Sequence, residues 1–259
     1  MENFNYKKKY GQNFLIDNYI KEKIVESIKP TNDDLIIEIG PGTGALTKFL
    51  KRYNANLIGV EVDTDTKIYL EKLKDEKTNF VFIDFLKMNF NDLIKNINYN
   101  NIYFVGNLPY YITTPIIERI IDISPNKKTI LIMIQKEVAE RFLAKPGSKK
   151  YGYITVLLNY YFNITKVVDV KKESFYPQPK VDSSVVKMVS KNTTPEVDIQ
   201  KFKQFLKDAF KFKRKTLKNN LSKYNLEEIN RVLLMNNYSL NNRAEDIDLD
   251  TFLDLYEIL

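Results

Sequence analysis

The sequence predicts an α/β protein with a mostly parallel β-sheet, helices on both faces of that sheet and a small all-α domain at the C-terminal end. Short β-rich runs alternate with helical patterns between residues 35 and 143, which is typical of βαβ units. A glycine-rich turn at residues 40–44 joins the first of these strands to a helix. After the linker candidate at residues 192–195, the pattern is helical only.

The elements of the α/β part follow one another in a regular order. A basic, aromatic arm covers residues 1–17, and a helix is expected at 17–29 with Asp17 as its N-cap. Strands are expected at 35–39, 56–61, 80–83, 102–106 and 129–135, and helices at 45–53, 64–74, 114–123 and 137–143. Two further β-rich runs, 164–170 and 184–189, flank a proline-rich loop and are expected to pair as an antiparallel edge.

The C-terminal part has the apolar spacing of packed helices. An i, i+3, i+4 stripe is formed by Phe202, Phe205, Leu206, Ala209 and Phe210. Further helices are expected near 226–236 and 249–258. We therefore predict two domains, residues 1–192 with the sheet and residues 193–259 with helices alone.

Composition excludes several kinds of chemistry. The 259 residues include no cysteine and no histidine, so disulfides, thiolate nucleophiles, Ser-His-Asp triads and His or Cys metal sites are excluded. Lys and Arg number 40 against 33 Asp and Glu, a formal net charge of +7. A basic balance suits a polyanionic partner, although a chain rich in Lys, Asn, Ile and Tyr throughout can also reflect genomic base composition.

No run of 18 apolar residues occurs, so no membrane span is expected. The N-terminal cations are not followed by an apolar segment, which argues against a secretory signal. A cytoplasmic protein is the expectation.

The loop Glu38-Ile39-Gly40-Pro41-Gly42-Thr43-Gly44 ends the first strand and opens a helix, where free N–H groups and close backbone approach suit a ligand. Its spacing fits both the dinucleotide pattern G-x-G-x-x-G/A and the E/D-x-G-x-G-x-G pattern of S-adenosylmethionine-dependent methyltransferases. Glu61, at the end of the second strand, could accept from both ribose hydroxyls of either ligand. Asp84, after the third strand, could accept from an adenine amine.

The tetrapeptide Asn107-Leu108-Pro109-Tyr110 follows the fourth strand. It distinguishes between a dinucleotide and S-adenosylmethionine as the ligand. Its amide oxygen and a carbonyl fixed by proline can accept from an exocyclic amine, and its aromatic ring can stack on a base. Hydride transfer needs none of these groups, and a nicotinamide oxidoreductase would need an acid or base that the sequence does not offer. Methyl transfer to an amino group is therefore favoured.

Together with the glycine-rich loop, this tetrapeptide makes the chain resemble the ribosomal RNA adenine N6,N6-dimethyltransferases. The resemblance is strongest to the KsgA-like branch that acts on small-subunit (16S-type) RNA. Five blocks in order carry the resemblance, at residues 9–15, 38–44, 107–110, 175–184 and 243–245. The resemblance implies a class I S-adenosylmethionine-dependent methyltransferase, with a Rossmann-like, seven-stranded, mostly parallel sheet and a small helical C-terminal domain that contacts RNA.

The resemblance also implies roles for individual residues. The cofactor, S-adenosylmethionine, would be bound by Asn13, Leu15, Gly40, Gly42, Glu61, Asp84 and Asn107. Asn107 and the Leu108 carbonyl, which Pro109 fixes, would hold the target amine, while Tyr110 and Phe175 would stack on either side of the adenine.

Three basic clusters are candidates for RNA contact, although each alone would be an ordinary solvated face. They comprise Lys7, Lys8 and Lys9; Lys145, Lys149 and Lys150; and Lys211, Lys213, Arg214, Lys215 and Lys218. Such residues contact phosphates without reading sequence, which predicts a steep salt dependence. The implied partner is small-subunit ribosomal RNA in a partly assembled 30S-type subunit, bound by a monomer without metal, with a role in subunit maturation.

Two related readings stay open. The antibiotic-resistance adenine methyltransferases of large-subunit RNA share the cofactor loop and the proline-rich loop, but Leu108 and the 243–245 ending favour the small-subunit branch. The second is a non-catalytic RNA-binding assembly or transcription factor on the same fold, against which the intact Asn107, Tyr110, Gly40 and Glu61 argue.

Overall fold

The computed structural model describes residues 13–123, 128–192 and 194–259. The chain divides into two compact units. The sheet unit runs to Ala139 and resumes at Thr165–Asn192, and the helical unit comprises Glu140–Ile164 and Thr193–Leu259. The sequence places Glu140–Ile164 in the first domain, whereas here Val156 of this segment is buried among residues of the helical unit such as Phe202.

The sheet has seven strands in the order β4-β3-β2-β5-β6-β9-β7. Its strands are β2 (Leu35–Ile39), β3 (Asn56–Glu61), β4 (Thr78–Phe82), β5 (Ile102–Asn107), β6 (Lys128–Gln135), β7 (Phe162–Val170) and β9 (Ser183–Ser190). The pairs from β4 to β6 are parallel, and β9 is antiparallel to β6. The expected mostly parallel sheet and the pairing of its two late β-rich runs at one edge are thus confirmed.

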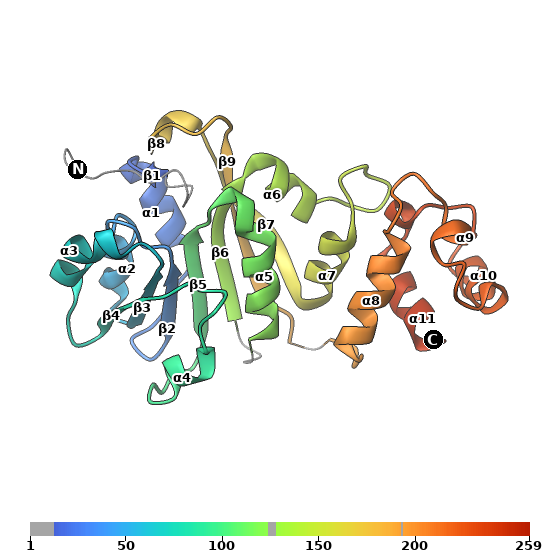
Figure 1. Ribbon diagram of the computed structural model, residues 1–259, viewed down its shortest axis with the longest axis horizontal. Coiled ribbons are helices and arrows are strands. Elements are labelled where there is room, and N and C mark those ends of the chain that lie inside the picture. The colour runs from blue at the N-terminus through green and yellow to red at the C-terminus, as the bar shows by residue number, and fades with distance from the viewer. Residues whose placement is uncertain (1–12, 124–127, 193) are drawn as a thin grey trace. The chain divides into compact units, whose positions relative to one another are not determined.

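Helices cover both faces of the central strands (Figure 1). On one face Ile24 of α1 (Asn18–Glu26) lies in a buried cluster with Ile36 of β2 and Val105 of β5. On the other, the ring of Phe90 in α4 (Phe90–Ile94) lies 5.7 Å from that of Phe104, whose side chain alternates with Val105 along β5. Strands buried on both faces explain why β2 reads as a nearly continuous apolar run.

Of the remaining helices, Tyr153–Tyr161 and Leu217–Asn220 were not expected, and the others differ from the expectation mainly in length. They are α2 (Thr47–Leu50), α3 (Lys67–Leu70), α5 (Thr113–Asp122), α6 (Lys136–Phe142), α7 (Tyr153–Tyr161), α8 (Ile199–Ala209), α9 (Leu217–Asn220), α10 (Leu226–Met235) and α11 (Leu249–Glu257). The expected helices at 45–53 and 64–74 are each a single α-turn extended by 3₁₀ turns. Helix α7 was not predicted. Its residues are buried around most of its circumference, so its sequence lacks the alternation of polar and apolar faces that indicates an amphipathic helix.

The helical unit has its own aromatic core. Phe202 of α8 packs edge-on against Tyr256 of α11 with ring centroids 5.4 Å apart, and Tyr160 of α7 packs on the same Phe202 at 5.5 Å. Aromatic pairs in this geometry add to the stabilisation that burial provides. The predicted stripe of α8 is therefore the face that closes this core.

Among the described residues, no helix has the length and apolar character needed to cross a membrane.

Candidate active site

The carboxyl ends of β2, β3 and β5 meet at one edge of the sheet. In the parallel register Ile39 lies opposite both Val60 and Gly106, so the segments that follow these three residues emerge side by side. Strand β2 lies between β3 and β5, so the chain order reverses there. Ligands of open α/β sheets bind at such a switch point.

A cavity of about 300 Å³ lies at this edge, within the range of small-molecule sites. Most of the residues expected from the sequence line it: Asn13, Gly40, Gly42, Glu61, Asp84, Asn107, Leu108, Pro109 and Tyr110. Phe14, Ile83 and Tyr111 also line it, although the sequence did not single them out as cavity residues. Their adjacency in the chain to Asn13, Asp84 and Tyr110 is the signal that could have identified them.

The glycine-rich loop combines an open side with a closed one. Gly40 has φ +68°, and a Cβ built there would meet no atom within 4 Å, so a ligand can approach its backbone. Gly42 has φ +57°, and a Cβ there would lie 2.3 Å from Cε1 of Phe14. A side chain at residue 42 would therefore displace the Phe14 ring from the cavity wall as well as strain the backbone.

The carboxylate of Glu61 closes the loop from the end of β3. Its Oε2 accepts from the N–H of Gly42 at 2.9 Å, and its Oε1 accepts from the N–H groups of Val62 and Asp63 at 2.8 Å each. Burial raises the pKa of Glu61, and these three backbone donors oppose that effect. A carboxylate offers about four acceptor sites, so one remains on Oε2 for a further donor.

Glu38, the acidic residue of the loop motif, lies deeper. It is 2% exposed, and its Oε2 accepts from the hydroxyl of Thr47 at 2.6 Å. Burial raises the pKa of Glu38 to about 8, so this carboxyl group is mostly protonated at neutral pH. It lines a second small cavity of about 40 Å³ that shares Gly40 and Asn107 with the larger one.

The side chain of Asn107 is oriented by the backbone of the N-terminal segment. Its amide nitrogen donates to the carbonyl of Asn13 at 2.7 Å. A carbonyl oxygen can only accept, so the nitrogen of the Asn107 amide must face Asn13 and the amide oxygen must face the opposite side. The next residue, Leu108, is anchored by its N–H to the carbonyl of Met133 at 3.1 Å, and Pro109 follows with φ −57°.

Tyr110 is held at its phenol end. Its hydroxyl and that of Ser183, at the start of β9, are 2.8 Å apart and hydrogen-bonded. Burial raises the pKa of Tyr110, so the phenol stays protonated near neutral pH. The neighbouring Tyr111 is 63% exposed at the rim of the same cavity.

The structure places Phe175, the expected second stacking ring, away from the larger cavity. Strand β8 (Phe175–Tyr176) pairs with β1 (Phe14–Leu15), and this register sets Phe175 opposite Leu15. Both side chains are buried in the cluster beneath α1, Phe175 at 2% exposure, and neither lines the larger cavity. Phe14, Phe85, Tyr110 and Tyr111 are the aromatic residues that do.

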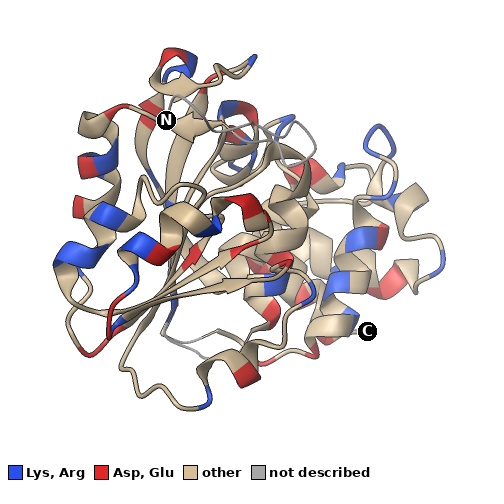
Figure 2. Cartoon of the chain, turned by 60° about the vertical axis from the view of Figure 1, so that its left-hand side comes forward, with Lys and Arg blue, Asp and Glu red and all other residues tan. Residues whose placement is uncertain are grey.

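The described basic clusters lie in the helical unit. Lys149, Lys150, Lys211, Lys213, Arg214, Lys215 and Lys218 are exposed, and Figure 2 shows Lys and Arg on loops as well as on helices of the chain. The side-chain amine of Lys213 donates to the carbonyl of Lys149 at 2.6 Å, which joins two of the clusters. Lys150 is ion-paired with Glu140. The cluster of Lys7, Lys8 and Lys9 lies outside the described residues.

No group of three or more Asp and Glu side chains with the spacing of a metal site is found in residues 13–123, 128–192 and 194–259. The polar groups around the cavity instead suit an organic ligand with hydroxyl and amino groups, since they are carboxylate, amide and backbone groups.

Comparison with known proteins shows similarity along the whole chain. The family model described as "Ribosomal RNA adenine dimethylase" matches residues 3–259. The protein named "Ribosomal RNA small subunit methyltransferase A" from Aster yellows witches'-broom phytoplasma (strain AYWB) is 42% identical over 257 residues, covering 96% of this chain and 94% of that protein. A protein of the same name from Mycoplasma mobile is 40% identical and covers 97% of each chain.

Solved structures give the same result for the fold. A dimethyladenosine transferase from Plasmodium falciparum superposes with a TM-score of 0.79 at 27% identity, covering 93% of this chain and 95% of that one. The 23S rRNA methyltransferase ErmE, at 24% identity and a TM-score of 0.74, shares the fold.

Proposed function

The chain belongs to the ribosomal RNA adenine dimethylase family, and from this premise we propose that its cavity holds S-adenosylmethionine beside an adenine of small-subunit ribosomal RNA and that the enzyme dimethylates the N6 amino group. The observation that carries this proposal is the contact between the Asn107 amide nitrogen and the Asn13 carbonyl. Because of this contact, the Asn107 side chain presents its amide oxygen, an acceptor, to the N6 amine of the adenine.

When bound, S-adenosylmethionine would supply an electrophilic methyl group on its sulfonium, and transfer would break the S–CH3 bond and leave the sulfur as a neutral thioether. Adenine N6 is a poor nucleophile because its lone pair is delocalised into the ring. The amide oxygen of Asn107 and the carbonyl oxygen of Leu108 accept the two N–H bonds and favour a pyramidal nitrogen whose lone pair is localised. Positioning of this kind contributes on the order of several kcal/mol.

No strong base is required. Once the nitrogen is alkylated, its proton is acidic and leaves to an amide oxygen, a carbonyl or solvent. A chain without histidine or cysteine therefore suffices. A second transfer needs the methylated amine to rotate and present its remaining hydrogen to one of these two oxygens.

The target base must leave its stack to reach the cavity, at a cost of a few kcal/mol. Tyr110 offsets part of that cost, since stacking on an aromatic ring is worth about 1–3 kcal/mol per base. The exposed Tyr111 at the rim is our candidate for the second stacking ring, in place of the buried Phe175. Of the expected cofactor contacts, Asn13, Gly40, Gly42, Glu61, Asp84 and Asn107 line the cavity.

We further propose that the substrate is a partly assembled small subunit, in the cytoplasm, in which the target nucleotides are still accessible. We also propose that the enzyme acts as a monomer. The small-subunit assignment is supported by relatives of that name at 40–42% identity over nearly the whole chain.

Incubation with labelled S-adenosylmethionine and under-methylated small subunits tests the proposal, with large subunits in parallel. We expect label on adenine N6 of the small-subunit RNA only. Asn107→Ala should abolish turnover and largely spare RNA binding. Label on the large subunit alone, or wild-type turnover by Asn107→Ala, would overturn the assignment.

A further inference from the structure

The helical unit carries an exposed aromatic ring inside its basic cluster that the cavity does not explain. Phe212 lies between α8 and α9 with 54% of its surface exposed. Its chain neighbours are cationic, and all of them are exposed: Lys211, Lys213, Arg214, Lys215 and Lys218. The adjacent Phe210, in contrast, packs against Phe252 with ring centroids 5.6 Å apart. The turn that follows α8 therefore directs one phenylalanine inward and the other into solvent.

The backbone beneath this ring is fixed on both sides. The buried side chain of Asn220 accepts from the N–H of Phe212 at 3.1 Å and donates to the carbonyls of Ala209 at 2.8 Å and of Phe212 at 3.3 Å. The N–H of Lys215 donates to the Phe212 carbonyl as well, at 2.9 Å. Both polar backbone groups of Phe212 are thus satisfied, so the backbone that carries the ring needs little further ordering on binding.

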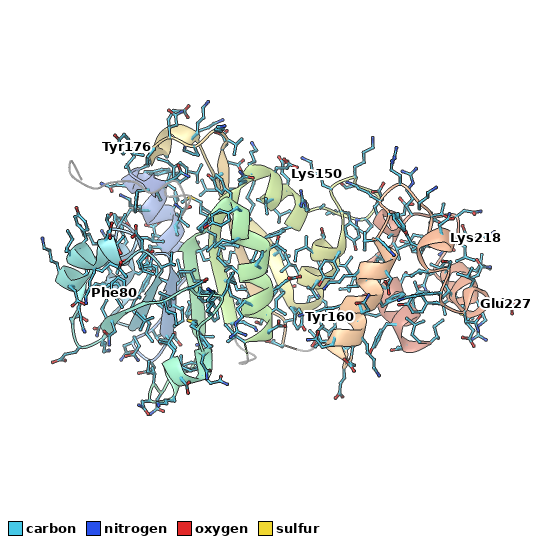
Figure 3. All side chains as sticks on the ribbon, in the orientation of Figure 1. Phe80, Lys150, Tyr160, Tyr176, Lys218 and Glu227 are labelled. Atoms are coloured by element: carbon cyan, nitrogen blue, oxygen red, sulfur yellow. The ribbon has the colours of Figure 1, made fainter. Side chains whose placement is uncertain are left out.

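The charges around the ring are not neutralised. Within the part of the chain that the structure describes, no carboxylate pairs with Lys211, Lys213, Arg214, Lys215 or Lys218. The amine of Lys211 lies 5.3 Å from the Phe212 ring centroid, within cation–π range. The bond from Lys213 to the Lys149 carbonyl brings Lys149 to the same surface, and the side chain of Lys218, labelled in Figure 3, extends from α9.

We propose that Phe212 is a stacking platform for one unpaired RNA base, with the flanking cations binding the phosphates on either side of that nucleotide. In a duplex both faces of each base are covered by neighbouring pairs, so only a looped, bulged or single-stranded nucleotide can present a free face. The occupant is therefore RNA with at least one unstacked base, bound by residues that do not line the cavity. This inference rests on the proposed function for its choice of RNA.

The test uses the full chain without cofactor and two probes: a single-stranded RNA oligonucleotide of mixed sequence, and that strand annealed to its complement. Phe212→Ala should weaken binding of the single strand by about tenfold, the effect of losing one stacked base. It should leave duplex binding within about twofold, and the slope of log Kd against log salt unchanged, because stacking releases no counterions. Phe212→Trp should restore the affinity.

Two further variants separate stacking from charge and from general surface effects. Lys213→Gln should weaken both probes and reduce the salt slope by about one. Met235→Ala, at a more exposed apolar residue of the same unit, should change neither. Equal melting temperatures of all the variants show that the fold is retained.

Unchanged binding by Phe212→Ala, or an equal loss for single strand and duplex, overturns the proposal. So does a loss of affinity for small-subunit proteins alone, which would make the surface a protein contact. The proposed function is judged separately, by methyl transfer. If the wild type turns over and Phe212→Ala binds RNA normally, only the stacking inference is overturned. If Phe212→Ala weakens single-strand binding but the wild type shows no turnover, only the assigned activity is overturned.

Discussion

The phenol oxygen of Tyr110 lies 2.8 Å from the hydroxyl oxygen of Ser183, a residue 73 positions further along the chain. Tyr110 belongs to the tetrapeptide that follows β5, whereas Ser183 begins β9 and is completely buried. The bond fixes the position of the phenol end of this aromatic ring at the cavity wall. A stacking ring set in advance reduces the ordering that a flipped base requires.

Removing the Ser183 hydroxyl should therefore impair catalysis. Ser183→Ala leaves the Tyr110 phenol without its partner, and an unmade buried hydrogen bond costs about 1–3 kcal/mol. We expect kcat/KM for small subunits to fall by roughly tenfold, as measured by methyl incorporation. Tyr110→Phe should give a similar loss, and the double variant no further loss. Additive losses would mean that the two hydroxyls act independently.

The orientation of Asn107 can be tested with a nearly isosteric change. Asn107→Asp sets a carboxylate oxygen against the Asn13 carbonyl, where the amide nitrogen now donates. Repulsion between two acceptors should rotate the group, and we expect turnover to fall by a factor on the order of 100, with RNA affinity retained. Asn159→Asp is the matched control, since the amide of Asn159 donates to the carbonyl of Thr155 in the helical unit. Equal damage by both variants would point to a general effect on stability.

The affinity for the cofactor should depend on Glu61, because its carboxylate holds the glycine-rich loop in place. In Glu61→Gln an amide NH₂ replaces one of the two oxygens that accept from Gly42, Val62 and Asp63. At least one N–H then loses its acceptor, and we expect S-adenosylmethionine to bind about 10–100-fold more weakly in calorimetry, because an unpaired buried donor costs about 1–3 kcal/mol. Glu71→Gln, at an exposed glutamate, is the control. Wild-type affinity in Glu61→Gln would contradict this dependence.

Glu38 should make the stability of the protein depend on pH. Burial raises its pKa from 4.5 to about 8 in the folded state, so between these values the folded chain keeps a proton that the unfolded chain has released. The stabilisation is complete below pH 4.5 and is lost as pH rises through about 8. Denaturant unfolding between pH 5 and 9 should show the free energy of unfolding of wild type falling relative to that of Glu38→Gln. A constant difference would place the pKa of Glu38 near its usual value.

Sequence reasoning identified those cavity-lining residues that follow directly from strand ends. Gly40, Glu61 and Asn107 each follow directly from a strand end, and parallel strands bring their ends to one edge. It could not place Phe175, because a strand of two residues has no alternation that would tell which face is buried. Only the register with β1 determines that.

The helical unit was predicted only in part for a similar reason. Its C-terminal helices have polar faces and clear periods, but α7 (Tyr153–Tyr161) is enclosed by apolar neighbours and has no period to read. The joining of the Lys149 loop to the Lys213 loop depends on tertiary contact, which spacing along the chain cannot reveal.

The path of the chain between the two units limits how the protein can be divided. Glu140–Ile164 leaves the sheet unit, supplies part of the helical core and returns as β7. A fragment that stops at residue 192 would keep this excursion but lose its partners, and the rings of Tyr151 and Tyr160 would be left in water. Such a truncated protein would be prone to self-association. Removing the helical unit without exposing its core requires deletion of both of its segments, with a new linker that joins the sheet unit where Glu140–Ile164 is removed.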